Sequence, residues 1–202
     1  MKQSQLSFEA DYSGPAPTWL TGPDVVTEGD FGSWATFSTD RQYRYLLGRI
    51  WDTDRPTLVL GMLNPSKAGG LRDDGQPDND PTVRRGLGFA KRDHYGSLIV
   101  WNACALISTD PKELTKHDDP YGPRNTEAIF AASRVPTLAR AVIAWGRPQD
   151  AAVGRLLRTA YAHAASAGRR LYRFGEPTKD GWPRHPLYLR SDTPIVECDG
   201  HP

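Results

Sequence analysis

The stretch TLVLGMLNPSKA, residues 57–68, decides the fold. Its apolar run ends at Gly61, and the chain then breaks into the Asn-Pro-Ser turn of residues 64–66. A continuous apolar run bounded by turn residues is typical of a strand buried on both faces. The carboxyl end of such a strand is where an open α/β sheet presents ligand-binding groups, so Asn64 stands at a position for a functional side chain. Asn-Pro is also an ordinary way to end a strand, and this alternative stays open.

Apolar patterns on both sides of this stretch predict further strands and helices. The predicted strands cover residues 33–38, 43–51, 97–107, 140–145 and 170–174, and the predicted helices cover residues 80–92, 125–133 and 149–167. The first two strands form a hairpin, with Tyr43, Tyr45 and Leu47 on one face. Because strands alternate with helices, we expect an α/β three-layer sandwich with a mostly parallel central sheet of about four strands, plus an N-terminal β-hairpin.

The length of 202 residues fits one domain. We expect an irregular N-terminal arm over residues 1–30, a single α/β domain over residues 31–196 and a tail over residues 197–202. A net charge of +1 gives no bulk electrostatic reason to bind nucleic acid or a membrane, so any such surface must be local. Two cysteines exclude a disulfide framework, and the lack of a long apolar run predicts a cytoplasmic protein without a membrane span.

Three polar residues lie at the ends of predicted strands or just beyond them: Asn64, Asn102 and His185. Asn102 lies in the apolar strand SLIVWNACALI, where an amide must be hydrogen-bonded or cost about 1–3 kcal/mol. A structural Asn bonded to loop backbone explains it equally well. The chain has no GxGxxG, GxxxxGK[ST] or GxSxG motif, and its five histidines show no metal-ligand spacing. We therefore expect no cofactor and no metal.

A polar loop over residues 67–80 follows the central strand. Its length and its glycine and aspartate content predict a surface loop that is either functional or mobile. Asp80 and Pro81 then have the residue types of a helix cap and of the first helical position. Arg84 and Arg85 lie on the predicted outer face of that helix.

Four short motifs occur in an order that resembles the uracil-DNA glycosylase superfamily. They are GMLNPS at 61–66, VWNACAL at 100–106, VIAWG at 142–146 and RHP at 184–186. Residues 40–190 are also similar to the uncharacterised family DUF1643, through the Asn-Pro-Ser turn, DPTVRR, TDP, DPYGPRN and RHPLYL. The resemblance implies a uracil-DNA-glycosylase-like fold.

The glycosylase resemblance also implies roles for residues that match its motifs. Asn64 and His185 are the implied catalytic residues: Asn64 positions water, and His185 donates to the base oxygen as it becomes anionic. Asn102 would read the edge of a flipped base, with Ser66 and Phe89 completing the base site.

The same resemblance implies contacts with a polymer. Leu187 and Tyr188 follow the His-Pro motif, where the family places a residue that wedges into the duplex. Arg84 and Arg85 are the candidate phosphate contacts.

The resemblance therefore predicts a nucleobase-processing enzyme that hydrolyses or modifies at the N-glycosidic bond of a pyrimidine, modified or not. Its partner would be nucleic acid, with DNA favoured over RNA, or a nucleotide. Two alternatives stay open: a non-catalytic nucleic-acid or nucleotide binding module, and a small-molecule enzyme on the same scaffold. The residues to follow for the last alternative are Lys67, Asp80, Thr82 and Asp110.

Overall fold

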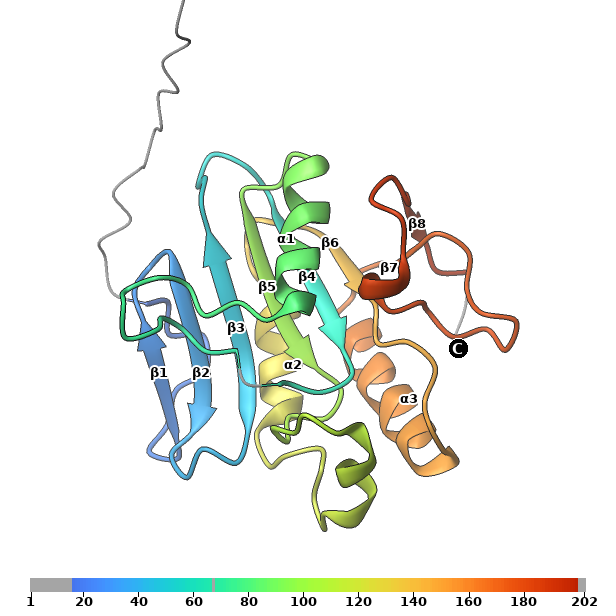
Figure 1. The fold of residues 1–202 in the computed structure, drawn as a ribbon, viewed down its shortest axis with the longest axis horizontal. Coiled ribbons are helices and arrows are strands. Elements are labelled where there is room, and N and C mark those ends of the chain that lie inside the picture. The colour runs from blue at the N-terminus through green and yellow to red at the C-terminus, as the bar shows by residue number, and fades with distance from the viewer. Residues whose placement is uncertain (1–15, 67, 200–202) are drawn as a thin grey trace, which may run out of the picture.

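An eight-stranded mixed sheet forms the centre of the protein, with the strand order β1-β2-β3-β5-β4-β6-β7-β8 (Figure 1). The computed structural model describes residues 16–66 and 68–199. The strands are β1 (Val25–Gly29), β2 (Ser33–Ser38), β3 (Arg44–Ile50), β4 (Thr57–Met62), β5 (Ser97–Asn102), β6 (Leu138–Ile143), β7 (Leu171–Phe174) and β8 (Ile195–Glu197). The stretch that decided the sequence interpretation is β4, which lies between β5 and β6 and is buried along its whole length.

The parallel part of the sheet consists of β5, β4, β6 and β7. The predicted hairpin is present as β2 and β3, but β3 pairs antiparallel with β5 and so extends the same sheet. The prediction of about four strands is therefore wrong for the sheet as a whole, because the hairpin joins it and β1 and β8 add an edge strand on each side. β1 lies within residues 1–30, where we expected irregular structure, whereas residues 1–15 lie outside the described part of the chain.

Helices cover both faces of the sheet, which makes three layers (Figure 1). α1 (Pro81–Arg92) packs on one face, where Val83 and Phe89 join Leu58 and Leu60 of β4. α2 (Asn125–Ser133) and α3 (Ala151–Ser166) pack on the other face. Two short 3-10 helices, η1 (Pro111–Lys116) and η2 (Pro186–Tyr188), lie in loops. No helix in the described ranges has the length and apolar character needed to cross a membrane.

A bulge in β3 changes which side chains share a face. Phe37 pairs with Arg44 and Thr36 pairs with Leu46, so Tyr45 is an extra residue between them. Tyr45 consequently joins the core on the α2–α3 face, while Leu47 joins the core on the α1 face. The predicted common face of Tyr43, Tyr45 and Leu47 is therefore wrong, because a bulge interrupts the two-residue alternation of a strand.

The long loop between β4 and α1 is tied to the sheet by Arg49 of β3. Arg49 is 3% exposed. Its Nε donates to Asn79 Oδ1 at 2.8 Å, and its Nη2 donates to the carbonyls of Gly69 at 2.7 Å and Asp78 at 2.8 Å. Ser33 Oγ donates to the carbonyl of Gly70 at 2.8 Å. The described part of this loop is therefore fixed in place by hydrogen bonds from the sheet.

Replacing Arg49 with Met should lower the free energy of unfolding by about 3 kcal/mol, because buried loop carbonyls lose their donors. Urea denaturation followed by fluorescence measures the change. Arg55→Met is the matched control: the Arg55 side chain is half exposed, at 50%, and forms a surface ion pair with Asp52. That control should cost less than about 1 kcal/mol. Equal effects of the two substitutions would show that Arg49 does not hold the loop.

Candidate functional site

A cavity of about 600 Å³ opens at the carboxyl ends of β4, β5 and β6, on the α1 face of the sheet. The connection after β4 leads through α1 to β5 on one side of β4, whereas the connection after β5 leads through α2 to β6 on the other side, so the two connections leave in opposite directions. Such a point is where open α/β sheets bind ligands. The cavity brings together five of the predicted site residues: Asn64, Ser66, Asn102, His185 and Tyr188.

Asn102 forms part of the cavity wall with an amide that has no hydrogen-bond partner. The residue is 1% exposed, and in the described ranges neither its Nδ2 nor its Oδ1 is bonded. The structure thus offers no loop-backbone partner of the kind that the structural alternative required. An unsatisfied buried amide costs about 1–3 kcal/mol of stability, and a ligand that hydrogen-bonds to its donor and acceptor would offset this cost. Both groups are therefore available to bind a ligand.

Asn125 has the opposite role at the same strand end. Its Nδ2 donates to the backbone carbonyls of Asn102 at 2.9 Å and Ala103 at 3.3 Å. Asn125 is the first residue of α2 and is fully buried. It therefore fixes the backbone of Asn102 while the Asn102 side chain stays available to the cavity.

His185 directly precedes η2, and it lines the cavity. Its Nδ1 accepts a hydrogen bond from the backbone N–H of Leu187 at 3.3 Å. The neutral ring then carries its proton on Nε2, which is the donor left for a ligand. Desolvation lowers the pKa of His185 below its usual 6.5, against the opposing effect of the Asp80 charge. The neutral imidazole is therefore the form present at pH 7.

Gly146 allows the loop after β6 to approach His185 closely. Its φ is +81°, and a Cβ at this position would lie 3.2 Å from the Cβ of His185. A larger residue would strain the backbone and press on the imidazole. This contact gives a physical reason for the Trp-Gly motif at the end of β6.

Asn64 and Ser66 are held by the loops around the cavity. Asn64 Nδ2 donates to the backbone carbonyl of Ser108 at 2.8 Å, which joins the loops after β4 and β5. Ser66 Oγ donates to Oδ2 of Asp80, whose Oδ1 caps α1 by accepting from the N–H of Val83 at 2.7 Å. Asp80 also lines the cavity, and it is the one carboxylate among the described residues that do so.

Three arginines line the cavity, and sequence reasoning assigned none of them to the site. Arg147 and Arg184 are exposed, and Arg147 pairs with Asp180. Arg44 is 2% exposed. The signal that could have found Arg44 is its place in the apolar strand RYLLGRI, where a charged residue needs a specific reason.

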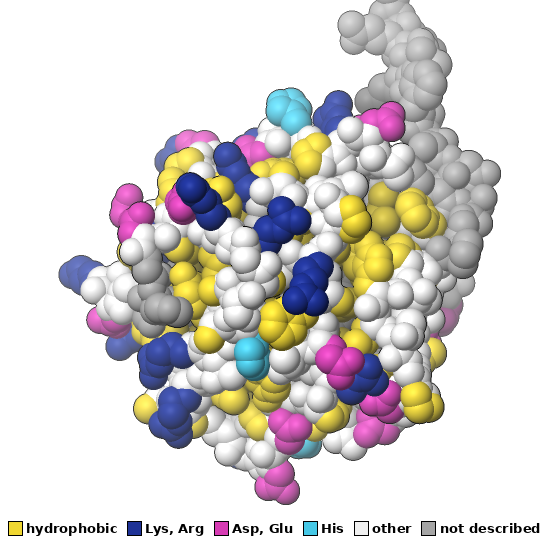
Figure 2. All heavy atoms as spheres, turned by 180° about the vertical axis from the view of Figure 1, so that it is seen from behind, with side chains coloured by type: hydrophobic (Ala, Val, Ile, Leu, Met, Phe, Trp, Pro, Cys, Tyr) yellow, Lys and Arg dark blue, Asp and Glu magenta, His cyan; other side chains and the backbone are white. Residues whose placement is uncertain are grey.

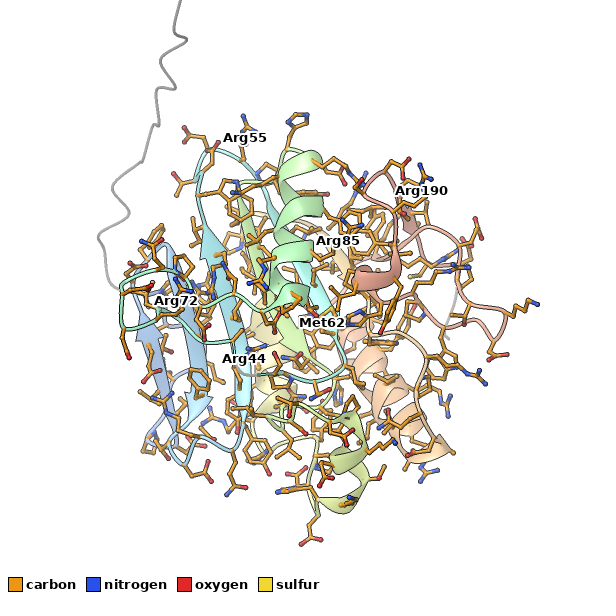
Figure 3. All side chains as sticks on the ribbon, in the orientation of Figure 1. Arg44, Arg55, Met62, Arg72, Arg85 and Arg190 are labelled. Atoms are coloured by element: carbon orange, nitrogen blue, oxygen red, sulfur yellow. The ribbon has the colours of Figure 1, made fainter. Side chains whose placement is uncertain are left out.

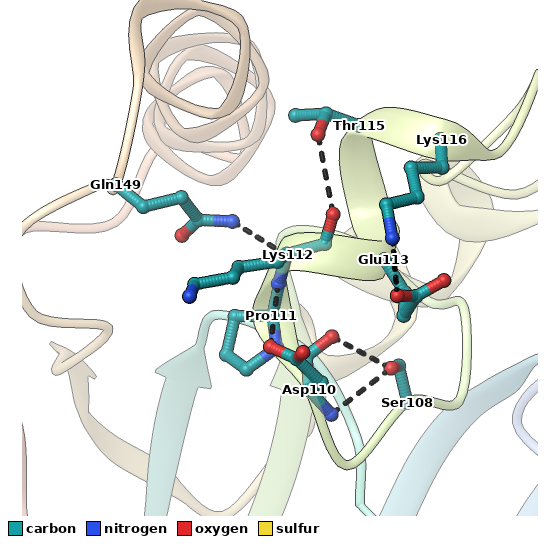
Figure 4. Close-up of polar contacts among 8 residues, drawn as sticks. All are labelled: Ser108, Asp110, Pro111, Lys112, Glu113, Thr115, Lys116 and Gln149. Carbon is teal, nitrogen blue, oxygen red and sulfur yellow. Dashed lines mark hydrogen bonds and ion pairs between the residues drawn. The ribbon is translucent and has the colours of Figure 1, made fainter.

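Part of the cavity wall comes from η1 and from the loop that precedes α3 (Figure 4). Gln149 Nε2 donates to the carbonyl of Pro111 at 2.5 Å, and both residues line the cavity. Asp110 caps η1 by accepting from the N–H of Lys112 at 3.0 Å. Of the residues named for a small-molecule enzyme, Asp80 and Thr82 line the cavity, Asp110 does not, and Lys67 lies outside the described residues.

Phe89 is not part of this cavity, which corrects the prediction that it contributes to a base site. It is 2% exposed and stacks on Phe174 with ring centroids 4.4 Å apart. Its position on the inner face of α1 buries it in the core. Packing against the sheet, rather than a ligand, occupies this aromatic ring.

The remaining predicted residues lie near the rim. Arg85 donates to the carbonyls of Pro186 at 3.3 Å and of Leu189, so it holds η2 against α1. Arg84 Nη1 donates to the carbonyl of Asn79 at 2.5 Å. Leu187 is 43% exposed and Tyr188 is 86% exposed, and of this pair Tyr188 alone lines the cavity. Their contact with a polymer stays a prediction.

The fold and site define an α/β protein with a polar cavity at the carboxyl edge of its parallel strands. Residues 44–187 match the family described as "Protein of unknown function (DUF1643)", and the chain belongs to that family. The match includes every cavity-lining residue except Tyr188. Comparisons with curated proteins and with solved structures found no match. Within the described ranges, no group of three or more His, Cys, Asp or Glu side chains is placed to hold a metal ion.

The lowered pKa of His185 should make stability depend on pH below about 6.5. The unfolded chain binds a proton on this ring more readily than the folded chain does. The stabilising contribution is therefore complete above pH 6.5 and falls as the pH drops from 6.5 through the folded pKa. We expect the free energy of unfolding of the native protein, relative to that of His185→Gln, to decrease between pH 7 and pH 5 in urea titrations. A difference that stays constant over this window would contradict the assignment.

Proposed function

We propose that this protein is a nucleobase-processing enzyme that hydrolyses the N-glycosidic bond of a pyrimidine nucleotide unit. The observation that carries the proposal is the unbonded amide of Asn102 in the cavity wall. A primary amide offers one acceptor and a donor side by side, which matches the adjacent donor and acceptor on the pairing edge of a pyrimidine. The motif order that resembles the uracil-DNA glycosylase superfamily supports the same function and fold.

In the proposed reaction the C1′–N1 bond breaks and its electron pair leaves with the base. Negative charge then develops on the base oxygens, where the Nε2–H of His185 donates a hydrogen bond. Such a donor, already oriented in a partly desolvated site, stabilises the developing charge without transferring a net proton. The lowered pKa of His185 suits this role because it keeps the ring neutral at pH 7.

Water completes the reaction by bonding through its oxygen to C1′ and losing a proton. Nδ2 of Asn64 is bonded to the carbonyl of Ser108, which holds the amide in place, and among the described residues its Oδ1 accepts no hydrogen bond and can orient this water. Asp80 is the carboxylate in the cavity wall that can accept the proton, which then passes to the departed base. The products are a neutral base and a sugar with a hydroxyl at C1′.

The partner can be a base within nucleic acid, with DNA favoured over RNA, or a free nucleotide. The exposed pair Leu187 and Tyr188 beside the cavity fits a wedge into a duplex. Figure 2 shows the face of the molecule opposite α1, where the basic side chains of the described residues are interspersed with acidic and apolar ones. The net charge of +1 gives the chain no strong overall attraction for a long duplex, which favours a small ligand.

Asn102→Ala should abolish pyrimidine binding while leaving the free energy of unfolding unchanged or slightly higher. The substitution removes an amide that already lacks partners, so the folded state loses no hydrogen bond. Asn125→Ala is the matched control, because it removes a buried amide whose Nδ2 donates two hydrogen bonds, and it should cost about 1–3 kcal/mol although its Oδ1 has no partner among the described residues. Calorimetric titration with a pyrimidine nucleoside and urea denaturation measure the two quantities. If the free energy of unfolding of Asn102→Ala falls as much as that of Asn125→Ala, Asn102 has a structural role and the proposal is contradicted.

A base-release assay tests the reaction itself. The purified protein is incubated with single- and double-stranded DNA and with free nucleotides that carry uracil, hydroxymethyluracil or other pyrimidines, and the free base is measured by chromatography. We expect release by the native protein and a loss of at least about 100-fold in His185→Ala, which lacks the donor to the leaving base. Binding without release would support the non-catalytic binding module. The absence of both binding and release would support a different small-molecule enzyme.

A further inference from the structure

Arg44 is a buried cation that forms no ion pair within the described part of the chain. It is 2% exposed, its Nε has no hydrogen-bond partner, and its Nη1 donates to the carbonyl of Ala68. Arg49, five residues further along the same strand, bonds through all three guanidinium nitrogens. The two arginines therefore differ in their hydrogen bonding. Arg49 donates to protein groups through each guanidinium nitrogen, whereas Arg44 lines the cavity and its Nε–H has no acceptor among the described residues.

The carboxylates nearest to Arg44 are already engaged elsewhere. Asp80 and Asp78 act on Arg44 electrostatically, but no ion pair with either is formed. Asp80 caps α1 and accepts from Ser66, and Asp78 Oδ2 accepts from the N–H of Gly69 at 2.9 Å. Burial lowers the pKa of Arg44 to about 10, so the guanidinium stays charged at pH 7. A buried charge without an oppositely charged partner destabilises the folded protein, and an anionic ligand would offset this cost.

The bulge at Tyr45 directs Arg44 to the same side of the sheet as Asn102. Arg44 bonds to Ala68, which belongs to the core on the α1 face, and both Arg44 and Asn102 line the cavity. β3 and β5 are neighbours in the sheet, so about 4.8 Å separates their backbones. Figure 3 shows Arg44 and Met62 at the same edge of the sheet, with Met62 at the end of β4. The base-reading amide and the unpaired cation thus come from neighbouring strands and line the same cavity.

We propose that Arg44 binds the phosphate of a free pyrimidine nucleotide whose base is read by Asn102. This inference rests on the proposed function for the identity of the base. In a nucleotide flipped out of a polymer, the base enters the pocket and the phosphates remain with the strand at the rim. Here the cation is as deeply buried as the amide, at 2% and 1% exposed. A phosphate can reach Arg44 only if it enters the cavity together with the base, which a mononucleotide can do.

The rim of the cavity suits the same ligand. Tyr188 is 86% exposed and its ring lies 5.7 Å from the ring of His185, so it offers an aromatic face for stacking above the pocket. Arg184 adds positive charge at the opening, where Arg147 is already paired with Asp180. Tyr188 and Arg184 can therefore attract and cover a small anion.

Calorimetric titration of the full chain with deoxyuridine 5′-monophosphate, deoxyuridine, inorganic phosphate and a uracil-containing single-stranded oligonucleotide tests the proposal. We expect the monophosphate to bind at least about tenfold more tightly than the nucleoside, because a charge-assisted hydrogen bond to phosphate is added. Arg44→Met should remove this difference, while Arg55→Met, at the opposite end of the sheet, should retain it (Figure 3). Arg44→Lys keeps a cation at the site and serves as the second variant if Arg44→Met does not fold.

Equal affinity for nucleoside and monophosphate in the native protein would overturn the proposal, as would preferential binding of the oligonucleotide. Failure of binding by all four probes would overturn it as well. These outcomes are separable from the proposed reaction, since titration measures binding and base release measures turnover. Monophosphate binding that depends on Arg44, with no release of base, would support the phosphate site and contradict the proposed hydrolysis.

Discussion

The hydrogen bonds from Arg49 to the loop between β4 and α1 are the constraint on which the cavity depends. The described residues of this loop form no strand or helix, yet the loop carries Asp80 and the start of α1 to the cavity. Two guanidinium nitrogens fix it against β3: Nε donates to Asn79, and Nη2 donates to the carbonyls of Gly69 and Asp78. The third, Nη1, donates to the carbonyl of Gly48 within β3. A buried guanidinium whose donors are satisfied costs less than an unpaired one, so polar groups can hold a loop within a mostly apolar fold.

Much of the fold could be predicted from apolar periodicity, because the buried strands and the amphipathic helices are continuous in sequence. The parallel strands, the hairpin and the helices all occur close to their expected ranges. β1 and β8 escaped prediction because they are short, half-buried edge strands whose residues show no strong apolar pattern. The joining of the hairpin to β5 is a long-range pairing, and local sequence does not specify which strand a hairpin will meet.

The site was predictable only where a polar residue follows a buried strand. Asn64, Asn102 and His185 were found in this way, and the cavity brings them together. Arg44 was missed because its direction depends on a bulge, and a shift of one residue moves a side chain to the other face. Phe89 was misplaced because helical periodicity gives the face of an aromatic residue but not whether a core or a ligand occupies that face.

The charges in the cavity indicate what kind of chemistry it can support. The described residues that line the cavity include three arginines and one carboxylate. Arg147 is paired with Asp180 outside the lining, and the oxygens of Asp80 already accept from Ser66 and Val83, so Arg44 and Arg184 remain without an ion pair among the described residues. The imidazole of His185 is neutral at pH 7 because burial lowers its pKa. A site with excess positive charge and neutral donors stabilises an anion more readily than it transfers a proton. Both a phosphate and a departing pyrimidine are anions, so one electrostatic arrangement serves binding and bond cleavage alike.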